Sequence, residues 1–368
     1  MIDPHVHLRD WNQKNKDTLE RSLSVLFKAG CCAAFEMPNT DPPLTSLENL
    51  RKRKKDVAEV ITKLGLGRFF HGMYGGITAD PVQIAEMVNA YKELYPYVVG
   101  LKMFAGNSTG NMGIIKEEEQ RLVYKTLAKE DVDYRGVLAV HCEKEAYVNS
   151  RLFVPSNPFT HTLARPPEAE VESVKDQIKF ANEAHYKGTL HICHISVPIA
   201  LEEIESARKY ADFRITCGLT PHHARLYDEM MKPEYWQSLG IELPFKPEEM
   251  ALFLKMNPAL RPRTMQEQML DALLAGRIDW IESDHANHSV GDKLKPPYAS
   301  GISVAPYLPH FIKFLKSRGM PDKMVEDLTH NNIANAFNIL MLENWPRDVD
   351  YNLAKEYAFD AFLGVKYG

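Results

Sequence analysis

Short apolar runs rich in β-branched and aromatic residues alternate along the chain with longer, charged stretches. The short runs are typical of buried strands, whereas the longer stretches show the apolar periodicity of amphipathic helices. The predicted strands are Ile2–Leu8, Cys31–Met37, Phe69–Tyr74, Val98–Phe104, Val137–Cys142, Leu190–His194, Phe213–Cys217 and Asp279–Ser283. The predicted helices between them are Thr18–Lys28, Leu47–Leu64, Pro81–Leu94, Lys116–Lys129, Glu168–His185, Pro198–Tyr210 and Met265–Ala275.

This alternation of strands and helices predicts a parallel sheet. Eight such units that close on themselves form a (β/α)8 (TIM) barrel, and we predict one barrel domain over residues 1–368. A doubly wound open sheet is the alternative, but no Gly-x-Gly-x-x-Gly pattern follows the first predicted strand. The stretch from Gly218 to Pro262 is long for one connection, so we expect extra helices on the face where the strands end. Two more helices are predicted near Val304–Lys316 and Met324–Asn338.

The composition is that of an ordinary globular protein, with 45% hydrophobic residues and a net charge of −5. This charge predicts no nucleic-acid partner and no membrane partner. No signal peptide opens the chain, and no apolar stretch approaches the ~18 residues that a membrane span requires. The five cysteines include the adjacent pair Cys31 and Cys32 and predict buried thiols in a reducing compartment. We therefore expect a cytoplasmic protein.

Polar side chains with metal-ligand chemistry recur at the ends of the predicted strands. His5 and His7 are two residues apart, so on a strand their side chains point to the same face. Later strand ends supply Lys102, His141, His194 and Asp284. In a barrel these ends converge on one mouth, where imidazoles and a carboxylate suit borderline ions such as zinc. Each residue alone is more often structural, so the prediction of a binuclear metal site depends on the joint pattern.

The motifs around these residues resemble those of the dihydroorotases in the amidohydrolase superfamily. The matching signatures are Asp3-Pro-His5-Val-His7-Leu-Arg9-Asp10, Met37-Pro-Asn39-Thr40, Thr220-Pro-His222-His223, Asn257-Pro-Ala-Leu-Arg261 and Glu282-Ser-Asp284-His285-Ala-Asn-His288. The resemblance extends from residue 2 to about residue 305 and implies the same barrel fold.

The resemblance also implies how the metal ligands are shared between two Zn²⁺ ions. The histidine pair of the first strand would bind one ion together with Asp284, and His141 and His194 would bind the second. Lys102 would be N-carboxylated and would bridge both ions. A carbamate is an anionic bidentate ligand, whereas a free ammonium would be repelled by two dications.

The implied reaction is the reversible cyclisation of N-carbamoyl-L-aspartate to L-dihydroorotate and water, in de novo pyrimidine biosynthesis. In the hydrolytic direction a metal-bridging hydroxide would attack the ring carbonyl, and Asp284 would pass its proton to the leaving nitrogen. The residues implied in substrate binding are Arg9, Asn39 and His288 for the carboxylate, the backbone near Asn257 and Ser300 for the ring, and Thr109 of the Gly106–Gly113 loop. A second copy of the chain and aspartate transcarbamoylase are the predicted protein partners.

Two alternatives stay open at this point. Another cyclic amidohydrolase (a dihydropyrimidinase, hydantoinase or allantoinase) would act on neutral rings, which have no carboxylate to match Arg9. A non-catalytic homologue that serves as a partner of aspartate transcarbamoylase would typically lose metal ligands, and this chain keeps them all. The motifs depart from the family at Trp11, Ala259 and Asn287, where proline is usual. His191 is expected to face the outer layer of the barrel or to support neighbouring loops.

Overall fold

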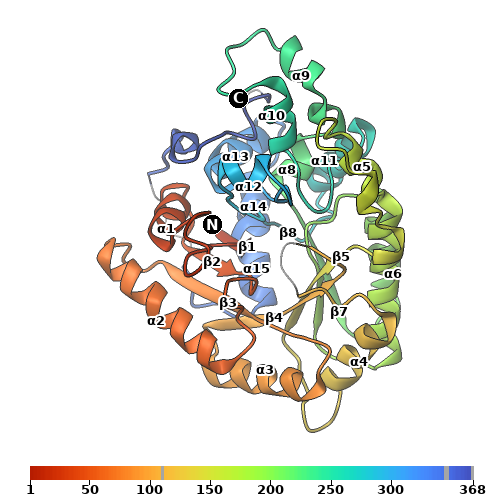
Figure 1. Ribbon diagram of the computed structural model, residues 1–368. Coiled ribbons are helices and arrows are strands. Elements are labelled where there is room, and N and C mark those ends of the chain that lie inside the picture. Colours follow the sequence, from red (N-terminus) through yellow and green to blue (C-terminus); the bar gives the residue numbers. More distant parts are fainter. Residues whose placement is uncertain (109–111, 344–347, 366–368) are drawn as a thin grey trace.

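The computed structural model describes residues 1–108, 112–343 and 348–365, and its eight parallel strands neighbour one another in chain order (Figure 1). The strands are β1 (Ile2–Val6), β2 (Ala33–Glu36), β3 (Phe70–Gly76), β4 (Val98–Ala105), β5 (Val137–Cys142), β6 (Thr189–Ile192), β7 (Arg214–Leu219) and β8 (Trp280–Ile281). A doubly wound sheet would reverse its strand order at a switch point. The sequential order therefore excludes that alternative and confirms the predicted (β/α)8 barrel.

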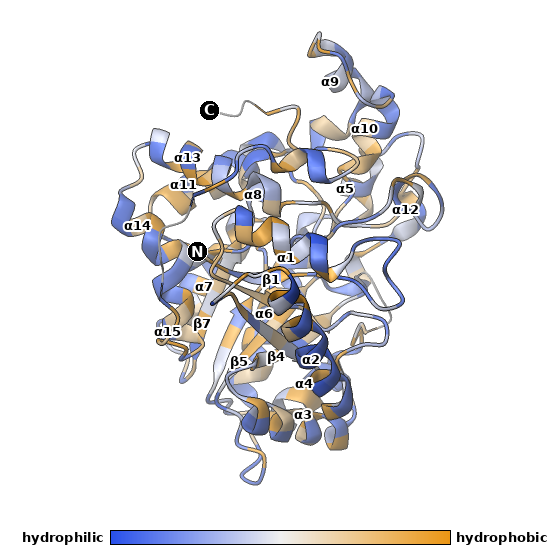
Figure 2. Ribbon diagram, turned by 90° about the vertical axis from the view of Figure 1, so that its left-hand side faces the viewer, coloured by the Kyte–Doolittle hydropathy of each residue, from blue (hydrophilic) through white to orange (hydrophobic). Residues whose placement is uncertain are grey.

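Seven long helices connect successive strands and cover the outside of the barrel (Figure 1). They are α1 (Leu19–Lys28), α2 (Leu47–Lys63), α3 (Pro81–Leu94), α4 (Glu117–Leu127), α6 (Pro167–Glu183), α7 (Pro198–Ala207) and α11 (Arg263–Leu274). Several begin where a side chain accepts a hydrogen bond from the first turn, as Thr18, Ser46 and Asp80 do. Hydrophilic and hydrophobic residues alternate along these helices, as the two colours in Figure 2 show, so each buries one side against the sheet.

The barrel interior has an apolar core of its own. The C-terminal helix α15 (Asn332–Ala336) closes the barrel at the end opposite the carboxyl ends of the strands. Phe337 follows this helix, and its ring centroid lies 5.1 Å from that of Phe35, 6.0 Å from that of Tyr74 and 5.9 Å from that of Trp280. These contacts fill the lower barrel with apolar side chains. The polar strand ends are left to define the mouth.

The barrel closes through the segment after β8 rather than through a long last strand. Val6 forms a parallel bridge with His285, and the backbone N–H of Ser283 donates to Asp3 Oδ1 at 3.0 Å. The predicted last strand Asp279–Ser283 is therefore too long, because regular pairing stops at Ile281. Asp284 has a positive φ of 48°, a conformation that a strand cannot contain.

Additional helices gather around the mouth, as the length of the Gly218–Pro262 stretch predicts. After β7 these are α8 (Pro221–Arg225), η3 (Asp228–Met231), α9 (Pro233–Ser238) and α10 (Pro247–Phe253). After β5 they are η1 (Glu145–Tyr147), η2 (Ser150–Leu152) and α5 (Thr160–Ala164). The chain after β8 adds α12 (Val290–Leu294), η4 (Ala305–Tyr307), α13 (Leu308–Ser317), α14 (Asp322–Glu326), the π-helical turn η5 (Asp327–Asn331), α15 and η6 (Leu353–Glu356), of which α15 lies at the opposite end of the barrel. No helix in the described part of the chain is both long and apolar enough to cross a bilayer.

Candidate active site and metal centre

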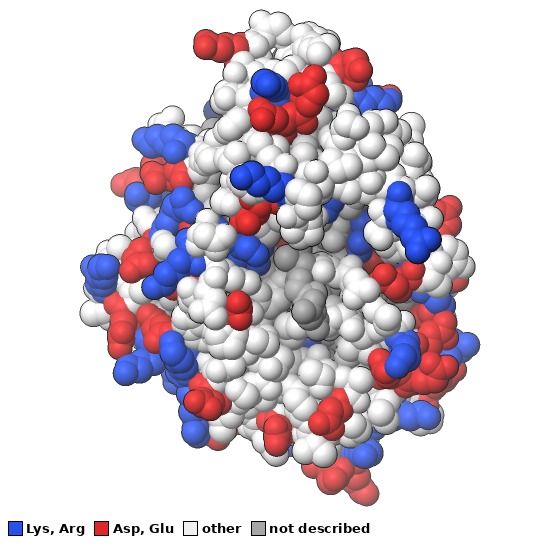
Figure 3. Space-filling model, in the orientation of Figure 1, with Lys and Arg blue, Asp and Glu red and all other residues white. Residues whose placement is uncertain are grey.

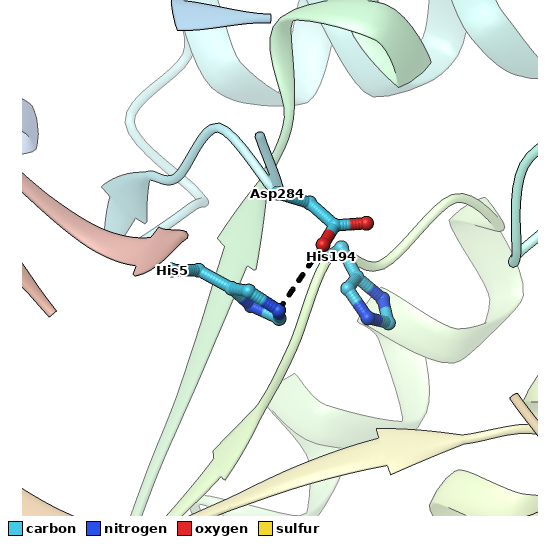
Figure 4. Close-up of side chains that lie close together, drawn as sticks. All are labelled: His5, His194 and Asp284. Carbon is cyan, nitrogen blue, oxygen red and sulfur yellow. Dashed lines mark ion pairs between the residues drawn. The ribbon is translucent and has the colours of Figure 1, made fainter. Parts of the chain in front are cut away.

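Three strand ends bring His5, His194 and Asp284 together at the mouth (Figure 4). His5 lies within β1, while His194 and Asp284 lie two and three residues beyond the ends of β6 and β8. Both of the latter have positive φ values, 35° and 48°. Such conformations are uncommon outside glycine and occur where surrounding structure holds a functional side chain in place. Ligand atoms of the three residues all lie within 4.8 Å of one another.

Asp284 is the centre of this group. Its Oδ1 lies 3.3 Å from His5 Nε2 and 2.9 Å from His7 Nε2. Burial disfavours the carboxylate, but the neighbouring histidines, above all the charge of His5, outweigh it, so the pKa of Asp284 lies well below its usual range. Burial likewise lowers the pKa of His5, and the charge of Asp284 more than reverses this, raising the pKa to about 10. The site therefore favours positive charge between these side chains.

The protonation of His7 tests whether a metal ion fits. His7 Nδ1 lies 2.6 Å from Asn39 Oδ1, and burial lowers the pKa of His7 to about 4. A neutral His7 that donates its Nδ1–H to Asn39 presents a lone pair at Nε2, which faces Asp284 Oδ1 at 2.9 Å. Two buried lone-pair atoms at this distance are unfavourable unless a cation accompanies them. The donor set, imidazole nitrogen and carboxylate oxygen, is one that zinc prefers.

His141 and His194 supply a second pair of imidazoles. His141 Nδ1 and His194 Nε2 are 3.2 Å apart, and burial together with the neighbouring His141 lowers the pKa of His194 well below its usual range. His194 Nδ1 has no hydrogen-bond partner among the described residues. The structure therefore brings the predicted second pair together, with one ring nitrogen of His194 left without a partner in the described chain. The assignment of each histidine to one of two ions stays a prediction.

Lys102 differs from the other predicted ligands because it does not line the cavity at the mouth. It is fully buried on β4, and its Nζ donates a hydrogen bond to Cys193 Sγ at 3.0 Å. Nζ also lies 5.0 Å from the centroid of the Phe104 ring. The predicted carboxylation and bridging role of Lys102 stay predictions.

A small cavity of about 30 Å³ opens between the predicted ligands and the predicted substrate-binding residues. Its lining includes the histidines at positions 5, 7, 141 and 194, Asp284, Arg9, Asn39, Asn257 and Ser300. Thr109, the predicted contact from the Gly106–Gly113 loop, lies outside the described residues. One small space thus brings together most of the residues that the motifs single out.

Arg9 and His288 form one wall of the site. Arg9 Nη2 donates to His288 Nε2 at 3.1 Å, and both side chains are buried. Arg9 Nε and Nη1 have no hydrogen-bond partner among the described residues. No carboxylate forms an ion pair with Arg9 in the described chain. A buried guanidinium with two free nitrogens is suited to a bidentate anion.

Glu282 is a buried residue that lies in a recognised motif but receives no role from the sequence. It accepts hydrogen bonds from His191 Nε2 at 2.9 Å and from the backbone N–H of His194, so it holds the segment that positions the ligand. Gly218 makes room for it, because a Cβ there would lie 2.4 Å from the Glu282 carboxyl carbon. His191 stacks on Trp280 inside the barrel, with ring centroids 4.3 Å apart. The expectation that His191 faces the outer layer is therefore wrong, since strand pairing turns its side chain inward. The other expectation, support of a neighbouring loop, agrees with its hydrogen bond to Glu282.

Three further residues near the mouth were not anticipated. Cys193, His5 and Glu282 form a second group whose ligand atoms lie within 4.8 Å of one another, so His5 belongs to both groups. His222 is buried, and neither of its ring nitrogens has a hydrogen-bond partner in the described chain. Arg165 pairs with Glu143, next to His141, and donates to the carbonyl of Asn107 at 2.8 Å. These contacts are visible only in the structure, because Cys193 and Arg165 are far in the sequence from the residues that they contact.

The fold and the site together define a (β/α)8-barrel protein with a candidate histidine–carboxylate metal centre at the strand ends. Solved structures with this fold include the L-hydantoinase (dihydropyrimidinase) from Arthrobacter aurescens, at 20% identity and a TM-score of 0.73. The superposition covers 94% of this chain and 72% of that one. A dihydroorotase from Campylobacter jejuni gives 19% identity and a TM-score of 0.64, covering 92% of this chain and 82% of the other. No family model matches the chain.

Curated relatives of this chain include dihydroorotases. The dihydroorotase of Halobacterium salinarum is 27% identical over 351 residues, which cover 92% of this chain and 71% of that protein. The dihydroorotase of Bacillus caldolyticus is 27% identical, covering 83% of this chain and 63% of its own length. The dihydroorotase of Thermococcus kodakarensis is 28% identical, and the match covers 80% of this chain and 57% of that protein. The resemblance stated from the motifs is confirmed, and the chain spans about 60 to 70% of the length of these relatives.

Proposed function

We propose that this chain is a metal-dependent cyclic amidohydrolase, and that its reaction is the reversible closure of N-carbamoyl-L-aspartate to L-dihydroorotate. The curated relatives named dihydroorotase support this reaction. The observation that carries it is Arg9, whose buried guanidinium lines the cavity with two nitrogens lacking a partner in the described chain. Dihydroorotate bears a carboxylate that would pair with this group, whereas neutral cyclic amides leave it unpaired.

Two zinc ions would be held by His5, His7, His141, His194, Asp284 and N-carboxylated Lys102. When bound, such ions lower the pKa of water and polarise a carbonyl oxygen. The residues of the chain would do the rest of the work. Arg9, Asn39 and His288 would hold the substrate carboxylate, and Asn257 and Ser300 would contact the ring from the opposite wall.

Asp284 is the group positioned to move the proton. Its depressed pKa keeps it ionised near neutral pH, so it can accept a proton from the attacking water at Oδ1 or Oδ2. It would then deliver this proton to the ring nitrogen as the amide bond breaks. Asn39 fixes the His7 ring through Nδ1, so that Nε2 stays directed at the carboxylate.

The decisive test compares three substrates with the purified, metal-replete protein. Dihydroorotate should be opened, whereas dihydrouracil and hydantoin, which lack the carboxylate, should be turned over at least about 100-fold less efficiently. Metal analysis of the same sample should find zinc. Turnover of the neutral rings alone would reject the proposed reaction.

A hydantoinase or dihydropyrimidinase activity is the second candidate, because the Arthrobacter aurescens hydantoinase superimposes with a TM-score of 0.73. The substrate comparison separates the two candidates directly. The cytoplasmic location, a homodimer and an association with aspartate transcarbamoylase stay predictions. Fractionation, size-exclusion chromatography and co-purification would test them.

A further inference from the structure

A buried ion pair lies beside the candidate metal centre and has no role in the proposed reaction. Charged side chains at the surface lie on both sides of a hollow near the centre of the face in Figure 3. Glu143 and Arg165, in contrast, are both buried. Glu143 directly follows β5 and is two residues from His141, one of the candidate ligands. A buried pair at this position calls for an account of what the carboxylate does there.

Arg165 holds the Glu143 carboxylate in a fixed position. Its Nε donates to Oε1 at 3.1 Å and to Oε2 at 3.0 Å, and its Nη2 donates to Oε2 at 2.6 Å. The same Nη2 donates to the carbonyl of Asn107 at 2.8 Å, and the carbonyl of Arg165 accepts from Arg261 Nη1 at 2.6 Å. A planar guanidinium that binds a carboxylate through several N–H groups fixes its orientation as well as its distance.

The backbone of Glu143 is held as closely as its side chain. Its N–H donates to the carbonyl of Ala105, the last residue of β4, at 3.2 Å. The next residue, Gly106, has a φ of 138° and packs against the Glu143 carbonyl, since a Cβ there would lie 1.9 Å from that oxygen. The carboxylate is therefore positioned both by the end of β4 and by the residue that follows α5.

This fixed carboxylate faces the ring of His141. Oε2 of Glu143 lies 3.2 Å from His141 Nε2, and no aligned hydrogen bond in the described chain engages that nitrogen. The other ring nitrogen, Nδ1, lies 3.2 Å from His194 Nε2, on the side of the second candidate ligand. A histidine that binds a metal usually donates its other ring N–H to a carboxylate or carbonyl, which fixes its tautomer and orientation. A proton at Nε2 leaves the lone pair at Nδ1.

We propose that Glu143 is a positioning residue of the metal centre, which orients the His141 ring with Nε2–H towards the carboxylate and Nδ1 towards the metal. Arg165 is the second positioning residue, because it holds that carboxylate in place. The assignment rests on the proposed function, since it needs a metal ion at His141. Neither residue would touch the substrate, and both would act through the metal ligand.

A second buried group of the same composition provides a matched control. Glu36 is paired with Arg53 and lies 3.1 Å from His71 Nε2, so it too combines a carboxylate, a guanidinium and an imidazole. His71 lies on β3 and does not line the cavity at the mouth. Glu36→Gln therefore removes the same kind of buried ion pair without touching a candidate metal ligand.

Zinc affinity tests the role without any turnover, by competition between the purified protein and a chromophoric chelator. Glu143→Gln should weaken zinc binding about 10- to 100-fold, the range for groups that orient a metal ligand. Glu36→Gln should bind zinc as tightly as the wild type, even if it is less stable. Wild-type zinc affinity in Glu143→Gln, or an equal loss in both variants, would overturn the proposal.

Glu143→Asp is the second variant if Glu143→Gln does not fold. It keeps a negative charge for Arg165 but withdraws the carboxylate from His141 by one methylene, so zinc binding should again weaken. Wild-type affinity in this variant would overturn the proposal. Heteronuclear NMR of the zinc-loaded, histidine-labelled wild type should find the His141 proton at Nε2, and a proton at Nδ1 would likewise overturn it.

These measurements separate the positioning role from the proposed reaction. Zinc binding that weakens in Glu143→Gln, in a protein that does not open dihydroorotate, would reject the dihydroorotase reaction and leave the role of Glu143 standing. Dihydroorotate turnover with unchanged zinc affinity in Glu143→Gln would do the reverse. A wild-type protein that binds no zinc would overturn both.

Discussion

Two buried charged clusters lie close to β1 and β2, and their pairing differs. In the Glu36 cluster (Glu36, Arg53 and His71), both carboxylate oxygens are used: Arg53 donates to each, and His71 Nε2 lies 3.1 Å from one. In the mouth cluster (Arg9, His7 and Asp284), Arg9 has two nitrogens without a partner and no ion pair in the described chain, whereas Arg53 lacks a partner only at Nη1 and is paired with Glu36. The two clusters are connected, because Arg53 Nη2 donates to the carbonyl of Arg9 at 2.7 Å.

This difference separates structural from functional buried charge. A carboxylate that accepts hydrogen bonds at both oxygens from an arginine and a histidine is satisfied by the protein itself. Donors and lone pairs that stay open in a buried site are unfavourable unless a ligand completes them. The Glu36 cluster also supports the mouth, because Arg53 binds the backbone carbonyl of Arg9, whose φ is 61°. Predictions that act on one cluster and spare the other test this distinction.

Asp284→Asn should have the largest effect, on chemistry rather than on folding. The amide keeps the shape of the side chain but cannot accept the proton, and loss of a general base lowers the rate by ~10²–10⁴-fold. We expect a folded protein that binds dihydroorotate and turns it over at least about 100-fold more slowly. Steady-state kinetics in both directions checks this. Near-normal turnover would assign the proton transfer to another group, such as His288.

Lys102→Ala should come next, with a loss of metal and about a 100-fold loss of activity, the upper range for groups that support a metal site. If a carbamate on Lys102 bridges the ions, short-chain carboxylic acids should restore part of the rate. Metal analysis and kinetics with added acetate or propionate measure both effects. Unchanged metal content and unchanged rate would show that Lys102 serves only its hydrogen bond to Cys193.

Arg9→Met should affect binding more than chemistry. Truncating one partner of a buried charge pair costs about 2–5 kcal/mol, so kcat/KM for dihydroorotate should fall about 30-fold or more. The neutral ring of dihydrouracil provides the control, since its slow turnover should not fall with the loss of the guanidinium. An equal fall for both substrates would mean that Arg9 supports the architecture of the mouth rather than the carboxylate.

The order of the strands and of the connecting helices could be predicted from the sequence. So could the position of five of the six candidate metal ligands at the cavity, all except Lys102. Periodicity reports which faces are buried, and a barrel brings strand ends together without further information. His141 and His194 illustrate this, since only the barrel closure is needed to bring them close.

The remaining features depend on pairings between distant residues. The inward position of His191 follows from strand register. The environment of Lys102 follows from its hydrogen bond to Cys193, the residue directly after β6. The short β8 reflects its pairing with β7, which stops at Ile281 and which a local apolar pattern does not report. Trp11, a departure from the family motif, donates to Asp56 Oδ2 at 2.8 Å and connects the Arg9 loop to α2. None of these partners is adjacent in sequence.

Glu36→Gln should have the smallest effect on turnover and a clear effect on stability. It leaves the buried Arg53 guanidinium without its counter-ion, which costs about 3–5 kcal/mol of unfolding free energy. Urea unfolding at pH 7 measures this loss. Glu59→Gln is the matched control, because Glu59 forms an exposed pair with Lys55 and should change stability by less than about 1 kcal/mol. A Glu36→Gln protein as stable as the wild type would show that the Glu36 cluster does not stabilise the fold.

The pH dependence of the same variant sharpens the comparison. Burial would raise the pKa of Glu36, but the charge of Arg53 and the hydrogen bond from His71 outweigh it and lower the pKa to about 2 from an unfolded value of 4.5. A carboxylate with a depressed folded pKa binds fewer protons when folded, so its stabilisation is present above pH 4.5 and is lost as the pH falls towards 2. A shift of this size corresponds to about 3 kcal/mol. The stability difference between wild type and Glu36→Gln should therefore shrink steadily on acidification below pH 4.5, and a difference that stays constant would mean that Glu36 does not titrate with folding.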